Sequence, residues 1–185
     1  MKIKDILDSI EPFLLDARQA EKNLELQPQS QFARRVYIRT LFAYIEGTIW
    51  VLKGACLNAK PKENTKRQIG IDEISILLEK TYQLKSNGNI KTTNMNLNLL
   101  DNIKFTFKYI NHTFTGDIDL QTDKEIWNQL RTAKKIRNRL SHPKKKSDLI
   151  ISDIESKICQ DICSWFNRIA QNAIELMIET GYQEK

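Results

Sequence analysis

The stretch "FARRVYIRTLFAYIEGTIWVLKGACL", residues 32–57, decides the fold class of this chain. Apolar side chains recur along it every three or four positions, which is the spacing of one buried face of an α-helix. That face consists of Ile38, Leu41, Phe42, Ile45, Ile49, Leu52 and Cys56. Gly47 lies inside the pattern at a cost of roughly 1 kcal/mol relative to alanine, so we expect another backbone to approach closely there. The stretch predicts one long core helix.

Amphipathic patterns on both sides of this stretch predict further helices. They span residues 2–24, 71–84, 123–142 and 152–181. In the first, Pro12 should kink the helix or restart it, because proline cannot donate a backbone hydrogen bond. In the last, Ser152 is expected as the N-cap, Glu155 as its capping-box partner and Gly181 as the residue just past the helix end.

The segment "IKFTFKYI", residues 103–110, fits two kinds of secondary structure. It alternates as a strand would, yet its apolar residues also share one helical face. We choose a helix, because we find no second convincing strand and an isolated strand would leave its backbone hydrogen-bonding groups unsatisfied. The polar stretches 58–70 and 85–96 are expected to be loops.

The length and composition are those of one ordered globular unit. The chain has 185 residues, of which 41% are hydrophobic and 28% charged, with few prolines and glycines. We predict a single domain over residues 1–185, in which residues 1–30 form an N-terminal helix or extension and residues 31–181 form the core. The fold class is all-α, an up-and-down bundle of about five or six helices.

Charge and hydropathy restrict the partner and the compartment. A net charge of +6 and a pI near 9.2 favour an anionic partner such as RNA, DNA or a membrane surface. No apolar run approaches the roughly 20 residues of a membrane span, and acidic residues interrupt the N-terminus where a secretory signal would be apolar. We therefore expect a cytoplasmic protein. Cys159 and Cys163, four residues apart in an apolar pattern, indicate core packing rather than redox or zinc chemistry.

The candidate chemistry concentrates in "KKIRNRLSHPKKK", residues 134–146. Asn138 and His142 are four apart and share a helix face, and the long side chain of Arg137 can reach the same spot. Pro143 should end the helix, so that His142 lies at its carbonyl end, which favours the protonated imidazole. One explanation is a phosphate-cleaving site; the other is a solvated helix end.

Arg137, Asn138, three intervening residues and His142 match the R-N-x-x-x-H motif of the HEPN superfamily, which this chain therefore resembles. The order of helices from about Gln31 to Gly181 is also similar to that of the family. The resemblance implies metal-independent RNA cleavage, without a cofactor, by a homodimer. In such a dimer the two motif helices face each other across a composite cleft.

The resemblance also implies a role for each motif residue. His142 would take the proton of the ribose 2′-OH or protonate the leaving 5′-oxygen, and the unperturbed pKa of a histidine, near 6.5, suits both tasks. Arg137 would hold the scissile phosphate through paired N–H donors. Asn138 would fix the histidine or the phosphate. Dependence on the 2′-OH makes the substrate RNA rather than DNA.

Basic residues around the motif are candidates for guiding the RNA backbone. They are Arg139, Lys144, Lys145 and Lys146, together with Lys134 and Lys135 one turn earlier. The alternative for the lysine run is an ordinary solvated loop.

A second group of charged residues follows the side of the long helix. Arg35, Arg39 and Glu46 could form a second layer of polar residues facing the site, with Arg39 and Glu46 as the main candidates, but a surface ion-pair stripe is the favoured interpretation. His112 is expected to be a capping or surface residue rather than a catalyst.

Three functions follow from these observations. The first is an HEPN-type endoribonuclease of the toxin or phage-defence kind; the second is a non-catalytic HEPN-fold module that binds RNA, a nucleotide or a protein; the third is a plain helical adaptor. Some HEPN toxins carry a tyrosine two residues after the motif histidine, the target of a partner nucleotidyltransferase antitoxin. Lys144 occupies that position here, so we do not expect silencing by that modification, although an antitoxin or other protein partner is possible.

Overall fold

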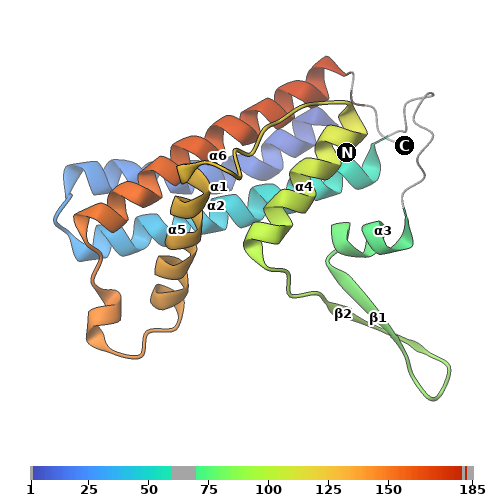
Figure 1. Ribbon diagram of the computed structural model, residues 1–185, viewed down its shortest axis with the longest axis horizontal. Helices are drawn as coiled ribbons and strands as arrows, with labels where there is room; N and C mark the ends of the chain where they lie inside the picture. Colours follow the sequence, from blue (N-terminus) through green and yellow to red (C-terminus); the bar gives the residue numbers. More distant parts are fainter. Residues whose placement is uncertain (1, 60–69, 181, 183–185) are drawn as a thin grey trace.

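The computed structural model describes residues 2–59, 70–180 and 182, and it confirms the all-α bundle (Figure 1). The helices are α1 (Ile3–Leu26), α2 (Gln31–Asn58), α3 (Ile71–Leu77), α4 (Leu99–Phe114), α5 (Glu125–Ser141), the 3-10 helix η1 (Lys146–Leu149) and α6 (Asp153–Glu179). One small antiparallel sheet accompanies them, formed by β1 (Lys80–Leu84) and β2 (Ile90–Asn94).

Helix α2 is the central element of the bundle. It packs against α1, α3, α4, α5 and α6. In Figure 1, α1, α2 and α6 run side by side along the long axis, and α5 runs crosswise to them. By length and by a mean hydropathy of 1.2, α2 could cross a membrane, but 61% of that window is buried inside the protein. Its apolar character is that of a core helix, as the sequence predicted.

Helix α1 bears on two sequence expectations, a kink or restart at Pro12 and the close approach at Gly47. It runs from Ile3 to Leu26 as one helix with Pro12 inside it, and it does not restart there. Gly47 of α2 faces α1, but what approaches it is a side chain rather than a backbone. A Cβ placed on Gly47 would lie 2.8–3.0 Å from three ring carbons of Phe13. The glycine therefore makes room for an aromatic ring.

The β-hairpin corrects the prediction of a helix over residues 71–84 and a loop over residues 85–96. Helix α3 ends at Leu77, and Glu79 adopts a left-handed backbone with φ 51°. The strands then pair in register from Lys80 opposite Asn94 to Leu84 opposite Ile90. An Asn87–Gly88 turn joins them, with Gly88 at φ 80°, and this dipeptide is a strong hairpin signal that the sequence analysis overlooked.

The remaining boundaries follow the predicted signals. Residues 103–110 lie in helix α4, as chosen. Helix α5 ends at Ser141, immediately before His142 and Pro143. Ser152 caps α6 by accepting from the Glu155 backbone N–H, and Glu155 completes the capping box. Gly181 and residues 60–69 of the expected loop lie outside the described residues.

Candidate functional site

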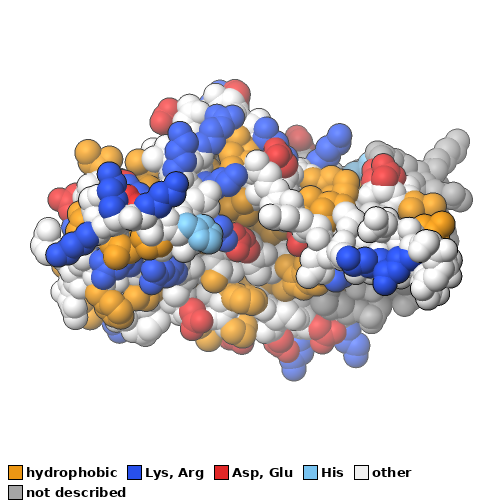
Figure 2. Space-filling model, turned by 90° about the horizontal axis from the view of Figure 1, so that it is seen from below, with side chains coloured by type: hydrophobic (Ala, Val, Ile, Leu, Met, Phe, Trp, Pro, Cys, Tyr) orange, Lys and Arg blue, Asp and Glu red, His pale blue; other side chains and the backbone are white. Residues whose placement is uncertain are grey.

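The motif histidine lies exposed at the carbonyl end of α5. His142 is the C-cap residue, and its backbone N–H donates to the Asn138 carbonyl at 3.1 Å. Within the part of the chain that the structure describes, no polar group engages the imidazole. Figure 2 shows Lys and Arg side chains gathered over this end of α5 and the loop that follows it. The imidazole is therefore available to a ligand in a basic environment.

Arg137 faces helix α2 rather than open solvent. Its Nη2 donates to Glu46 Oε1 at 2.6 Å, and its Nη1 donates to Asn138 Oδ1 at 3.3 Å. The guanidinium carbon also lies 5.9 Å from the centre of the Phe42 ring. About a third of the side chain is still exposed, at 35%. The guanidinium is thus held in place by three neighbours while part of it stays open to a ligand.

Glu46 is the counter-charge of the motif arginine. Burial raises the pKa of its carboxyl group, the negative charge of Glu79 raises it further, and Arg137 opposes both effects. The ion pair joins α2 to α5 over 91 residues of sequence. Glu46 therefore lies beside the motif, the position expected of a residue in a second polar layer.

Arg35 and Arg39, one helical turn apart on α2, also reach the motif segment. Arg39 donates to the Leu140 carbonyl at 3.4 Å, and Arg35 donates to the Leu149 carbonyl at 3.1 Å. Among the described residues, neither forms an ion pair with Glu46. The favoured prediction of a surface ion-pair stripe was wrong. These two arginines instead satisfy backbone carbonyls of α5 and of the loop after it.

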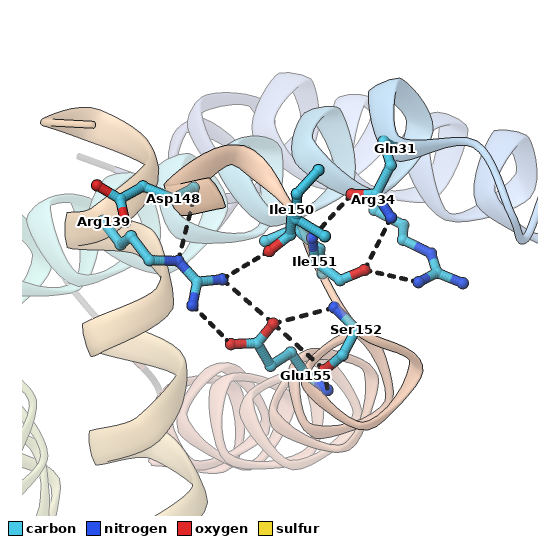
Figure 3. Close-up of polar contacts among 8 residues, drawn as sticks. All are labelled: Gln31, Arg34, Arg139, Asp148, Ile150, Ile151, Ser152 and Glu155. Atoms are coloured by element: carbon cyan, nitrogen blue, oxygen red, sulfur yellow. Dashed lines mark hydrogen bonds and ion pairs between the residues drawn. The ribbon is translucent and has the colours of Figure 1, made fainter. Parts of the chain in front are cut away.

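Arg139 has a structural role that the sequence did not reveal (Figure 3). Its guanidinium donates to the Asp148 carbonyl at 3.0 Å, to the Ile150 carbonyl at 3.0 Å and to both carboxylate oxygens of Glu155 at 2.9 and 3.1 Å. Burial alone would raise the pKa of Glu155, but the hydrogen bonds from Arg139 and Ser152 lower it below its ordinary value. Because these contacts occupy all three guanidinium nitrogens, we do not retain Arg139 as an RNA contact.

The same region of the loop is tied to α2. The Gln31 side chain donates to the Ile151 carbonyl at 2.9 Å and accepts from the Ile151 N–H at 2.7 Å. Buried Arg34 donates to the same carbonyl at 2.7 Å (Figure 3). It also pairs with Asp153. These contacts fix the chain between α5 and α6, so the basic loop starts and ends at anchored points.

The lysines predicted to contact RNA differ in exposure and in their hydrogen bonds. Lys134 donates to Asn98 Oδ1 at 2.8 Å and bridges α5 to the start of α4. Lys135 is exposed on α5. Lys144, Lys145 and Lys146 are exposed, and the backbone N–H groups of the first two donate to Asp148 Oδ2 at 2.8 and 3.1 Å. These bonds lower the pKa of Asp148 and curl the loop so that its lysine side chains point to solvent.

A groove of about 760 Å³ lies beside Arg137 and Asn138. Helix α2 contributes Glu46 and Trp50, α5 contributes Lys134, Arg137 and Asn138, and the segment from Met95 into α4 forms the remaining wall. The sequence analysis did not identify Trp50 or this segment as part of the site. The one available signal was that Trp50 lies four residues after Glu46, on the same face of α2.

A buried ion pair lies next to this groove. Lys53 is 0% exposed, and its Nζ donates to Glu79 Oε1 at 2.9 Å and to the Ile76 carbonyl at 3.1 Å. Burial lowers the pKa of Lys53, while Glu79 opposes that effect. Glu79 also accepts from Asn102 Nδ2 at 3.0 Å. The charge of Glu79 on the groove wall is therefore matched by a lysine from the core.

The other candidate side chains have structural positions. His112 is exposed in the last turn of α4, with its ring 6.3 Å from that of Tyr109. Cys159 and Cys163 are buried in the core, as expected from their pattern, and Cys56 is buried as well. Among residues 2–59, 70–180 and 182, no three His, Cys, Asp or Glu side chains gather as metal ligands would.

Comparisons of the chain with models of protein families, with curated proteins and with solved structures found no match.

Proposed function

We propose that this protein is an HEPN-like endoribonuclease of the toxin or phage-defence kind, which cleaves RNA in the cytoplasm through the ribose 2′-OH. One observation carries the proposal. The R-N-x-x-x-H residues lie at the exposed end of one helix, where the His142 imidazole is unengaged by the described residues and Arg137 borders a groove. Histidine and arginine beside an accessible groove are the residue types that this reaction requires.

The proposed reaction needs only groups of the protein and of the substrate. His142 removes the proton from the 2′-OH, and the 2′-oxygen attacks the adjacent phosphorus. Arg137 donates hydrogen bonds to the phosphate oxygens and stabilises their developing charge. The bond to the 5′-oxygen breaks, that oxygen receives a proton, and the products carry a 2′,3′-cyclic phosphate and a 5′-OH. A second histidine, from another copy of the chain, can supply that proton if two motif helices face each other.

Asn138 and the lysines would position the substrate. The Oδ1 atom of Asn138 accepts from Arg137, which orients the amide so that its N–H₂ group is available to a phosphate. Lys144, Lys145 and Lys146 project from an anchored loop next to His142 and would attract the RNA backbone. Glu46 and Arg39 would hold Arg137 and the end of α5 in place.

A non-catalytic module that binds RNA or a nucleotide is the second candidate. It is favoured by the ion pair between Arg137 and Glu46, because a carboxylate at this distance offsets the charge that would stabilise a transition state. Under this alternative the motif binds a phosphate without turnover.

The test is cleavage of a mixed RNA pool in the presence of EDTA, followed by analysis of the product ends. We expect the wild type to produce cyclic 2′,3′-phosphate ends, and His142→Ala to lower the rate by about 10²- to 10⁴-fold, since positioned proton transfer contributes that much. Arg137→Ala should lower it as well. Thr132→Ala, an exposed change on the same helix outside the motif and the basic residues around it, is the matched control and should cleave like the wild type.

The outcomes separate the two candidates. Intact RNA with the wild type, combined with binding that Arg137→Ala weakens, would support the non-catalytic module. Cleavage that His142→Ala leaves unchanged would refute the proposed role of the motif.

A further inference from the structure

We propose that the groove beside the motif is a nucleobase subsite, in which a base next to the scissile phosphate stacks on Trp50. The ligand class is single-stranded nucleic acid, whose unpaired bases are free to splay out. The inference deepens the proposed function and rests on it in taking RNA as the substrate.

The exposure of Trp50 is the first observation. Its side chain belongs to a helix that is mostly core, yet it is 53% exposed, whereas Trp127 and Trp165 are 1% and 4% exposed. An exposed tryptophan on the wall of a polar groove offers a flat surface on which any base can stack. Such stacking is sequence-tolerant, since every base has a π-face.

The second observation is the position of Trp50 relative to the motif. Trp50 lies one helical turn after Glu46, whose carboxylate holds the guanidinium of Arg137 at 2.6 Å. One turn of helix rises about 5.4 Å, a separation that a single ribose can bridge. A base on Trp50 would thus be joined through its own sugar to a phosphate at Arg137.

The third observation is the chemistry of two further residues of the groove. Asn96 and Asn98 line the same groove as Trp50, and both are exposed. The Oδ1 of Asn98 already accepts from the Leu100 N–H and from Lys134, which leaves its N–H₂ group to donate to the polar edge of a base. The Asn96 amide can both donate and accept. A duplex does not offer a base in this way, because its bases stay stacked and paired.

The charge balance of the groove suits a polyanion. Glu46 is paired with Arg137, and Glu79 with the buried Lys53. Lys134 adds a positive charge on the same wall. The segment from Lys80 to Asn98, which supplies the hairpin and the third side of the groove, holds three lysines and no Asp or Glu. These hairpin lysines do not line the groove, so phosphates that flank the stacked base would meet Lys134 and Arg137, its basic lining residues.

The first test uses the fluorescence of the protein itself. The probe is a 2′-O-methyl RNA hexamer, which keeps the ribose but lacks the nucleophile and so cannot be cleaved. Because Trp127 and Trp165 are buried, we expect saturable quenching from Trp50 on titration, and no quenching with Trp50→Phe. The Trp50→Phe variant should still bind the labelled hexamer, as judged by anisotropy, because phenylalanine also stacks.

The second test measures affinity with a matched control. Trp50→Ala should weaken binding of the labelled hexamer by about 5- to 150-fold, the equivalent of losing one stacked base. A hexamer with abasic sugars should bind the wild type weakly, and Trp50→Ala should leave that weak affinity unchanged. The control is Phe32→Ala, because Phe32 lies on the same helix, is 70% exposed and is not a groove residue. This variant should bind the labelled hexamer as tightly as the wild type does.

The failures of the two proposals can be told apart. Hexamer affinity that Trp50→Ala leaves unchanged overturns the subsite, even if RNA cleavage by His142 is established. A change in molecular mass with Trp50→Ala and no loss of binding also overturns it, since Trp50 would then be a subunit contact. Quenching and the affinity loss without RNA cleavage would support the subsite and overturn the ribonuclease.

Discussion

Arg137 and Arg139 are two residues apart on the same helix, and the structure gives them opposite tasks. Arg137 turns toward α2, where it meets Glu46 beside a groove. Arg139 turns toward the loop and α6, where all its nitrogens bind protein groups. Side chains two positions apart on a helix point in nearly opposite directions, so one residue faces the candidate ligand while the other fixes the fold.

This difference predicts that Arg139→Ala destabilises the protein. The change would leave the Glu155 carboxylate and two carbonyls without their donor, and hydrogen bonds to charged groups contribute about 1.5–3 kcal/mol. We expect urea unfolding to report a loss of about 2–3 kcal/mol. Arg139→Lys should recover only part of it, because an ammonium group cannot bind the carboxylate through two parallel donors.

The difference in stability between the wild type and Arg139→Ala should also depend on pH. Because the pKa of Glu155 lies below its ordinary value of 4.5, the carboxyl group is more easily protonated in the unfolded chain. The contribution of the ion pair is therefore complete above that value and is lost as the pH falls through the folded-state pKa. Unfolding of wild type and Arg139→Ala at several pH values between 3 and 7 would measure this. A difference that grew toward low pH would contradict the assignment. Lys145→Ala, exposed on the loop, should change stability by less than about 0.5 kcal/mol.

At the scale of the elements, the contact between α1 and α2 depends on a missing side chain. Gly47 places no Cβ where the Phe13 ring packs. The glycine costs α2 roughly 1 kcal/mol of helix propensity, and the close approach of the ring explains why that cost is tolerated. The ring is also partly exposed, at 37%, so it has some freedom to move.

A double-mutant cycle on Gly47 and Phe13 tests this account. In the Phe13→Ala background, Gly47→Ala should raise the free energy of unfolding by about 1 kcal/mol, the gain in helix propensity. In the wild-type background, Gly47→Ala should raise the free energy of unfolding by less than this or should lower it, because the new methyl group displaces the ring. Urea unfolding of the four proteins gives the coupling, expected at about 0.5–1 kcal/mol. Equal gains in both backgrounds would mean that the ring does not need the glycine.

The β-hairpin is the element that sequence periodicity alone did not predict. Every residue from Thr81 to Asn94 is exposed, so no alternation of buried and exposed positions marks the strands. An isolated hairpin is only marginally stable in water. Here, the Glu79 carbonyl accepts from the Met95 N–H at 2.7 Å and closes its base. Local turn chemistry and this additional backbone bond thus take the place of a buried face.

At the scale of the molecule, the end of α5 and its basic loop form one exposed surface (Figure 2). The proposed reaction needs an acid and a base, and one chain offers one unengaged imidazole at this end. A second copy that presents the same surface would supply a second imidazole, with Arg137 on each side of the shared phosphate. The net charge of +6 opposes close approach of two such surfaces, and an RNA strand between them would offset the repulsion.

We therefore expect activity that depends on a dimer. Cleavage per chain should fall when the protein is diluted below the dimer dissociation constant, and sedimentation at the same concentrations should show the loss of dimer. Two copies joined by a flexible linker should stay active on dilution, because the second copy is held at a high local concentration. Full activity per chain from a monomer would overturn the two-chain site.

By itself, the sequence determined the long helices, the N-cap of α6 and the segment that carries the motif, because periodicity, N-cap chemistry and the R-N-x-x-x-H spacing all act within a few turns of one helix. Only the tertiary structure decided the task of each basic residue. Arg137 meets Glu46 across 91 residues, Arg139 meets the loop and α6, and Trp50 meets the segment before α4 in a groove. Such contacts depend on how helices rotate and cross in the packed core, and that rotation is fixed by the summed burial of many side chains rather than by any local pattern.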